Sequence, residues 1–134
     1  MNTEIIVVAI SSVVAISVAA VSYVQAKKLK FFETFFQRKA DAFEEYMEKI
    51  SSVPTTKEEL YAFCASSRKA TLYSFAKNRG LIDALMDLGI KAHLKRGEDG
   101  QIPEEFQNAF RIQRTEIITA LRDEMQQSTK FKYN

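Results

Sequence analysis

Residues 5–24 read IIVVAISSVVAISVAAVSYV, which is twenty consecutive positions without a charged side chain. A helix of this length, rising about 1.5 Å per residue, covers about 30 Å, the thickness of the hydrocarbon core of a bilayer. Within lipid an isolated segment satisfies its backbone polar groups only as a helix, despite the preference of Val and Ile for strands. The sequence therefore predicts a transmembrane anchor over residues 5–25, after a short extracytoplasmic N-terminus at residues 1–4.

A cleaved secretory signal is the main alternative for an apolar segment near an N-terminus. Such signals have a basic start, an apolar core of about 7–15 residues and a cleavage site with small side chains. Residues 1–4, MNTE, contain no basic side chain, and the apolar core is longer than that of a signal. The basic residues follow the segment instead, at Lys27, Lys28 and Lys30, and such residues stay on the cytoplasmic side. We expect an uncleaved, single-pass signal anchor with its N-terminus outside and its C-terminal domain in the cytoplasm.

Small side chains recur at four-residue intervals within the span, at Ser11, Ala15 and Ala19. This small-xxx-small spacing lets two transmembrane helices approach closely, so these three residues form a candidate dimer face. The alternative is coincidence, because eight of the twenty residues in the span are Ala or Ser.

The segment that follows the span combines basic residues with aromatic ones. Residues 27–39, KKLKFFETFFQRK, contain four of the ten Phe. If the helix continued straight, Phe36 would lie about 18 Å beyond the span, too far for the bilayer to cover its ring. We expect Phe32 and Phe36 in the core of the following domain, and the other two rings against lipid or a second protein. The membrane-interface residues expected from this arrangement are Lys27, Lys28, Lys30, Phe31 and Phe35.

Glycine and proline divide the rest of the chain into three predicted helical blocks. All four Gly lie between positions 80 and 100, and the two Pro are Pro54 and Pro103. The first block continues from the membrane to about Ile50, with apolar residues at three- and four-residue steps. Lys39 occupies one slot in that apolar series.

The two later blocks have recognisable starts. Thr56-Lys57-Glu58-Glu59 has the form of a capping box, in which Thr and Glu side chains satisfy backbone amides at the beginning of a helix. Pro103 suits the first turn of the last helix, because its missing amide would be unpaired there, and Glu104 and Glu105 complement the helix dipole. Between these starts, the second helix is expected to kink near Gly80.

Three amphipathic helices with short connections pack most simply as an antiparallel bundle. The predicted fold class is all-α: a single N-terminal transmembrane helix continues into a small antiparallel three-helix bundle over residues 26–127. A flexible tail is expected at residues 128–134.

The residue types that carry enzyme chemistry are sparse. The chain has one Cys and one His, so it cannot form an internal disulfide or a histidine-rich metal site. We expect Cys64 to be a small buried apolar residue and His93 to be solvated at a basic helix end. A calcium-binding loop around residues 98–100 is excluded, because Lys95 and Phe106 would occupy positions that need acidic ligands. The sequence predicts no catalytic, cofactor or metal site and no small-molecule substrate.

Nucleic-acid binding is also not expected. The basic run at residues 91–96 is followed by an acidic loop and an acidic helix start, which nearly cancel it locally. The net charge of the whole chain is only +2.

Three stretches carry a resemblance: RKATLY at residues 68–73, LIDAL at residues 81–85 and IITALRD at residues 117–123. Together with the N-terminal anchor, this layout resembles that of uncharacterised short bacterial and phage membrane-anchored helical proteins. The similarity covers residues 40–125. It implies a helical fold and membrane attachment, and it carries no activity and no functional residues.

These observations lead to two hypotheses about function. The first is a non-enzymatic, membrane-tethered helical module that recruits or organises a protein partner at the cytoplasmic face, through the Phe-rich segment after the span. The second is a structural membrane component that forms homo-oligomers through the small-residue face of its span.

Overall fold

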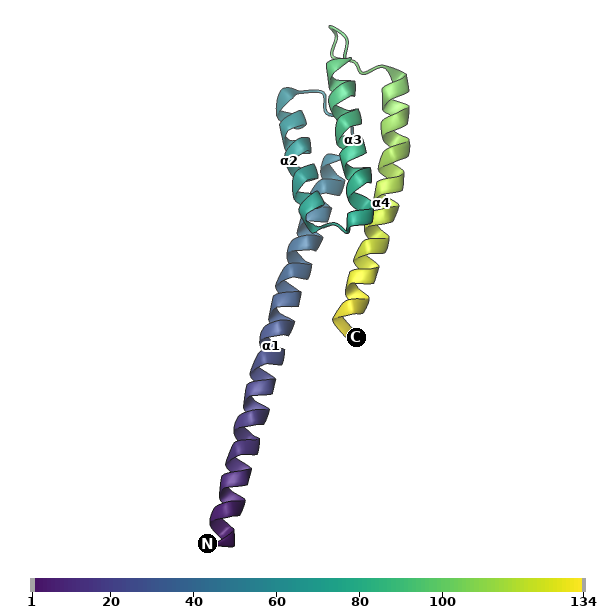
Figure 1. Ribbon diagram of the computed structural model, residues 1–134. Helices are drawn as coiled ribbons and strands as arrows, with labels where there is room; N and C mark the ends of the chain where they lie inside the picture. The colour runs from purple at the N-terminus through teal and green to yellow at the C-terminus, as the bar shows by residue number, and fades with distance from the viewer. Residues whose placement is uncertain (1, 134) are drawn as a thin grey trace. The chain divides into compact units, whose positions relative to one another are not determined.

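The computed structural model describes residues 2–133, with side chains up to Thr129, and every regular element in them is a helix. The helices are α1 (Thr3–Lys49), α2 (Lys57–Tyr73), α3 (Ala76–Leu94) and α4 (Glu104–Tyr133), shown in Figure 1. The predicted all-α class is therefore confirmed. The chain forms two compact units, one up to Phe35 and one from Phe36 onward, whereas the sequence placed the boundary after residue 25. We call them the anchor unit and the bundle unit.

The anchor unit is the first part of α1. No Gly or Pro occurs between Thr3 and Lys49, so nothing in the sequence interrupts this 47-residue helix. The hydroxyls of Ser12 and Ser17 donate to the carbonyl oxygens of Val8 and Val13, each at 2.9 Å. These two hydroxyls are thus satisfied by their own helix.

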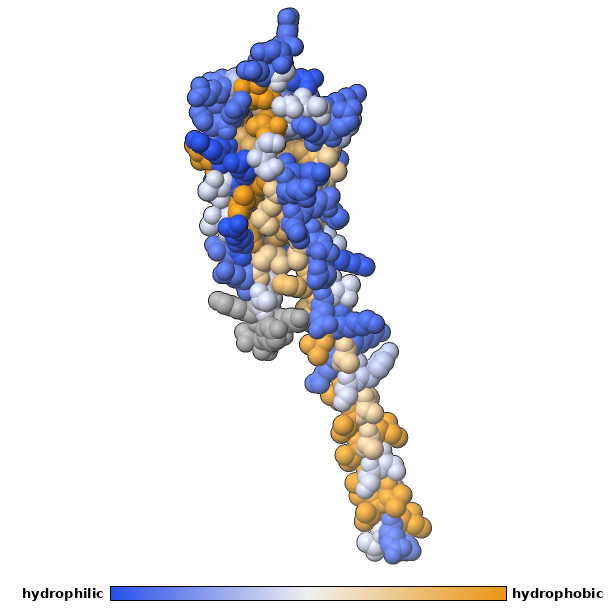
Figure 2. All heavy atoms as spheres, turned by 180° about the vertical axis from the view of Figure 1, so that it is seen from behind, coloured by the Kyte–Doolittle hydropathy of each residue, from blue (hydrophilic) through white to orange (hydrophobic). Residues whose placement is uncertain are grey.

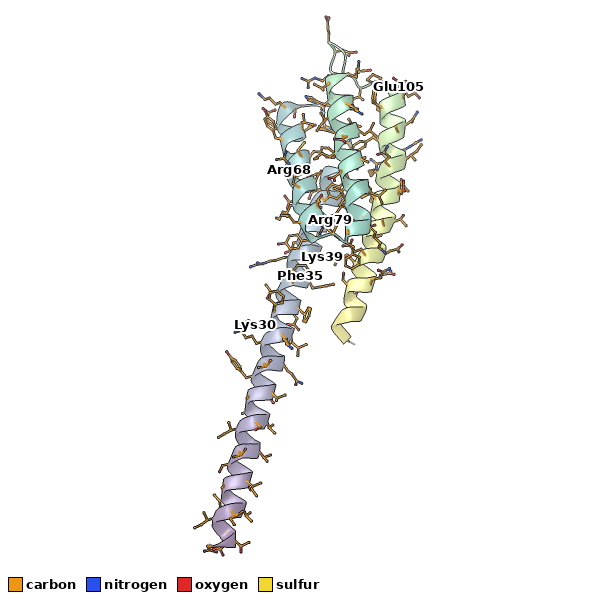
Figure 3. All side chains as sticks on the ribbon, viewed as in Figure 1. Lys30, Phe35, Lys39, Arg68, Arg79 and Glu105 are labelled. Carbon is orange, nitrogen blue, oxygen red and sulfur yellow. The ribbon has the colours of Figure 1, made fainter. Side chains whose placement is uncertain are left out.

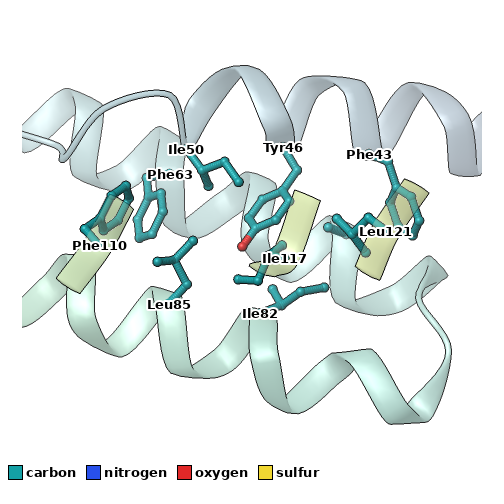
Figure 4. Packing of buried hydrophobic residues seen from close by; sticks show 10 residues of the cluster. Phe43, Tyr46, Ile50, Phe63, Ile82, Leu85, Phe110, Ile117 and Leu121 are labelled. Carbon is teal, nitrogen blue, oxygen red and sulfur yellow. The ribbon is translucent and has the colours of Figure 1, made fainter. Parts of the chain in front are cut away.

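The bundle unit combines the C-terminal part of α1 with α2, α3 and α4, and successive helices run in alternating directions (Figure 1). Four helical segments take part, where the sequence predicted three. Each contributes to a common core, shown in Figure 4. The fully buried apolar members of this core are Phe43, Tyr46, Ile50, Phe63, Ala70, Ile82, Leu85, Phe110, Ile117 and Leu121.

The start of α2 is as predicted. The Thr56 hydroxyl oxygen accepts from the amide of Glu59 at 3.1 Å, and the Glu59 carboxylate accepts from the amide of Thr56 at 3.5 Å. These bonds form a complete capping box, so α2 begins at Lys57.

The break between the second and third helices lies at Ser74 and Phe75, which corrects the predicted kink near Gly80. Both residues have extended backbone angles, and the Phe75 amide donates to the Glu124 carboxylate at 2.7 Å instead of to a helical carbonyl. Gly80 lies inside α3, where a Cβ atom would meet nothing within 4 Å. Long-range pairing with α4 therefore stabilises a break at residues that carry no strong helix-breaking signal.

The last helix continues beyond its predicted end. The sequence predicted a flexible tail from residue 128, but α4 runs to Tyr133. Ser128 and Thr129 donate to the carbonyl oxygens of Glu124 and Met125, and Ser128 also accepts from Lys39 on α1. No pattern in the polar sequence around Ser128 predicts the hydrogen bond with Lys39.

Candidate functional site

The apolar part of α1 exposes its large side chains on all sides. Exposure reaches 70% at Ile16, and Figure 2 shows most of the segment coloured as hydrophobic. Among the described residues, α1 is the one helix long and apolar enough to cross a membrane. The exposed Val and Ile side chains of this segment are Ile5, Ile6, Val7, Val8, Ile10, Val13, Val14, Ile16, Val18, Val21 and Val24.

Ser11, Ala15 and Ala19 are all exposed on α1. Because the helix is continuous, their four-residue spacing places them on one side of it, as a close helix contact would require. Their role as a dimer face stays a prediction.

The predicted membrane-interface residues also lie on α1 and are exposed. Phe31 is 67% exposed and Phe35 is 43% exposed, and Phe31 packs edge-on against Phe32 with ring centroids 6.2 Å apart. The expectation that Phe32 enters the bundle core is wrong, because its side chain is 55% exposed, whereas Phe36 is half-buried. The set of exposed aromatic residues on α1 is therefore larger than the sequence predicted.

A buried ion pair joins α1 to α4 within the bundle unit. The Lys39 ammonium nitrogen lies 2.7 Å from Oε2 of Glu124, and the two side chains are 2% and 0% exposed. Oε1 of Glu124 accepts from the amide of Phe75 and from Nδ2 of Asn78, the latter at 2.9 Å. The carboxylate thus connects α4 to the turn between α2 and α3.

Lys39 makes the matching contacts from α1. Its Nζ donates to the Ser128 hydroxyl oxygen at 3.0 Å and lies 4.1 Å from the centroid of the Phe75 ring. The Phe43 ring is 5.5 Å away on another side. A hydrogen bond, a carboxylate and two aromatic faces therefore replace water around this ammonium group. Lys39 is labelled in Figure 3, at the end of the bundle unit that carries the α2–α3 turn.

From the sequence alone, Lys39 is only an interruption of an apolar series. The signal was nevertheless present, because a Lys at a core-facing position is almost never fully buried without a partner. Its partner on the last helix had no local signature.

The single Cys and the single His of the chain both take part in packing within the bundle unit. Cys64 is half-buried at the edge of the core, and burial raises the pKa of its thiol, partly offset by the positive charge of Arg68. His93 is buried, and its Nδ1 lies 3.2 Å from the carbonyl oxygen of Pro54. The prediction of a solvated imidazole is therefore wrong, because the end of α3 packs against the loop before α2.

Two surface hollows of about 380 and 390 Å³ border Ser52, at the end of the bundle unit away from Lys39. Glu48 and Glu58 line one of them, and Arg111 and Arg114 line the other. Arg114 donates to the carbonyl oxygen of Ser51, which occupies part of its guanidinium group. In the described part of the chain, no group of three or more His, Cys, Asp or Glu side chains is placed to hold a metal ion.

Comparisons with family models, curated proteins and solved structures found no match for this chain.

Proposed function

We propose that the protein is a non-enzymatic, membrane-tethered helical module that recruits or organises another protein at the cytoplasmic face of a membrane. The apolar part of α1 is the anchor, with the N-terminus outside. The basic residues that set this orientation are Lys27, Lys28 and Lys30. The observation that supports a recruiting role is the exposure of the Phe31 and Phe35 rings beyond the end of the apolar span.

The position of these rings along the anchor unit favours a protein partner over lipid. Phe31 and Phe35 lie seven and eleven residues after Val24, which is about 10 Å and about 16 Å of helix. The polar layer outside the hydrocarbon core is only about 7 Å thick on each side of a bilayer. A helix that crosses upright therefore carries Phe35 beyond the headgroups. Burying an exposed Phe side chain contributes about 1.5–3 kcal/mol, so the two rings would supply a substantial share of the binding energy of a partner.

The test exchanges Phe31 for the photo-crosslinking residue p-benzoylphenylalanine in the full-length protein in its native membrane. We expect a defined crosslinked protein band, which is lost when the Phe35→Ser substitution is added. A crosslink to lipid alone would contradict recruitment through this surface.

A matched control separates this surface from general loss of apolar area. The Leu72→Ser and Leu94→Ser substitutions remove two other exposed apolar side chains, which are 77% and 74% exposed on the bundle unit. Affinity purification of the Phe31→Ser/Phe35→Ser variant should lose the partner, whereas the Leu72→Ser/Leu94→Ser variant should retain it. If both variants retain the partner, the recruiting surface lies elsewhere on the molecule.

The second candidate function is self-association within the membrane. It is supported by the alignment of Ser11, Ala15 and Ala19 on one exposed side of a continuous helix. The Ala15→Leu substitution should convert an oligomer to a monomer in mild detergent, because the larger side chain prevents close approach of two helices. A wild-type protein that is already monomeric in mild detergent would remove this candidate.

A further inference from the structure

The bundle unit is electrically asymmetric along its length. The half near the α2–α3 turn comprises residues 36–43, 66–85 and 118–129, and it holds seven Lys or Arg and four Asp or Glu. The other half, residues 44–65 and 86–117, holds seven Lys or Arg and eleven Asp or Glu. The first half therefore has a net charge of +3 and the second a net charge of −4. Arg79 and Glu105, labelled in Figure 3, mark the two ends.

The exposed cations of the positive half include Lys77 and Arg79 at the α2–α3 turn. The Lys77 ammonium group lies 5.9 Å from the centroid of the Phe75 ring, and Nε of Arg79 donates to the carbonyl oxygen of Ser74 at 3.3 Å. The buried Glu124 is already neutralised by Lys39, 2.7 Å away. The buried carboxylate thus does little to cancel the exposed positive charge at this turn.

These two cations do not favour the helix that carries them. The first turn of α3 has no acidic residue, and positive charges near a helix N-terminus oppose the helix dipole. Residues that violate a local preference tend to occur at functional sites. Here the favourable interaction would come from an anionic surface outside the molecule.

We propose that the bundle unit docks on an anionic lipid surface through the α2–α3 turn, with Lys77 and Arg79 among the headgroups. This inference rests on the proposed membrane anchoring. The turn is at the end where α1 enters the bundle unit, as the 4.1 Å contact between Lys39 and the Phe75 ring shows. The twelve residues from Val24 to Phe36 cover about 18 Å as a helix, so this end of the bundle unit stays close to the bilayer, and a tilt of α1 brings it to the headgroups. Each Lys or Arg near an anionic bilayer contributes appreciably to binding, and the negative half would face away.

The test places the full-length protein in nanodiscs of phosphatidylcholine alone or with phosphatidylglycerol. Cys64, the single Cys, is replaced by Ser, and a spin label is attached at an Ala76→Cys substitution on the turn or at Gln101→Cys at the far end. A headgroup-chelated nickel lipid reports proximity to the surface. We expect the position 76 label to be relaxed strongly only in the anionic nanodiscs and the position 101 label in neither. The effect should fall in high salt, because surface charges are screened.

Two charge-reversal variants with the same change in net charge serve as the test and its matched control. Lys77→Glu/Arg79→Glu should lower the ratio of docked to free bundle at least about 30-fold. Lys57→Glu/Lys95→Glu, at the negative end, should leave the position 76 signal unchanged.

An equal position 76 signal in both lipids, or an equal loss in both variants, would overturn docking through this turn while leaving the anchor intact. Failure of the wild-type protein to enter nanodiscs at all would instead reject the anchor, and docking with it. If Lys77→Glu/Arg79→Glu abolishes the photo-crosslink from position 31 to a protein, and the position 76 signal does not depend on lipid charge, the turn binds protein instead of lipid.

Discussion

Lys39 and Glu124 carry opposite charges into a core that excludes water, and each is tolerated only because the other is there. Transfer of a single charge into a protein interior costs several kcal/mol, and a well-placed partner with further hydrogen bonds offsets most of that cost. Glu124 has three contacts of this kind, with Lys39, Phe75 and Asn78. The pair therefore specifies how α1 is positioned against α4 more than it adds net stability.

The Lys39→Met substitution should destabilise the bundle unit by about 3–5 kcal/mol, because it leaves the Glu124 carboxylate buried without a cation. Adding Glu124→Gln should recover most of that loss, since an amide oxygen still accepts from Phe75 and Asn78 without a net charge. Urea unfolding of the full chain in mild detergent, followed by circular dichroism, measures both variants. A double variant as unstable as Lys39→Met alone would show that the charge pair itself is required.

The helices α2 and α3 show which features of an element can be read from sequence. The capping box at Thr56 and Glu59 was recognisable because both partners lie within one helical turn. The end of α2 was not, because the Phe75 amide bonds to a carboxylate on α4 and no local residue signals the break. The kink predicted at Gly80 was wrong for a related reason. Gly80 and Gly89 both lie within α3, and only their tertiary surroundings differ.

Those surroundings predict opposite effects of the same substitution. Gly89→Ala should destabilise the protein by about 1–3 kcal/mol, because the new Cβ would lie 2.6 Å from Cε1 of the Phe63 ring. Gly80→Ala should stabilise it by about 0.5–1 kcal/mol, because a helix-interior glycine is replaced where nothing lies within 4 Å. The two midpoints of thermal unfolding should move in opposite directions. A loss of stability in Gly80→Ala would indicate that position 80 needs a non-helical backbone after all.

The α2 capping box should make stability depend on pH. Hydrogen bonds from Thr55 lower the pKa of the Glu59 carboxyl from its ordinary value of 4.5. Because the folded state favours the ionised form, this contribution is fully present above pH 4.5 and is lost as pH falls through the lower pKa of the folded state.

The difference in unfolding free energy between wild type and Glu59→Ala should be constant from pH 7 to about pH 5 and should shrink in more acidic solution. Denaturant titrations at a series of pH values measure it, with Glu58→Ala, the preceding exposed residue of the same helix, as control. A difference that grew on acidification would mean that the neutral carboxyl is the favoured form.

At the scale of the whole molecule, the two units have opposite relations to water. The bundle unit has apolar residues from four helices around a common core, whereas the large apolar side chains of the anchor unit are exposed around the helix. Composition alone separated these two parts, because twenty uncharged residues at one end have few structural solutions. It did not place the boundary at Phe36, since residues 26–35 have the charges of a soluble segment but take part in no bundle core.

The exposure of the anchor unit predicts that one charge at its centre should matter far more than the same charge on the bundle unit. Val14 lies at the middle of the apolar span, and a Lys at the centre of a transmembrane helix costs about 2.5–3.5 kcal/mol of insertion free energy. Eight Ala or Ser residues already weaken the apolar character of this span, so little excess is available to offset that cost. Val14→Lys should therefore move much of the protein out of the carbonate-resistant membrane fraction. Leu94→Lys, at an exposed position of the bundle unit, should remain in it. Equal membrane retention of both variants would mean that the apolar segment is covered by protein and does not cross the bilayer.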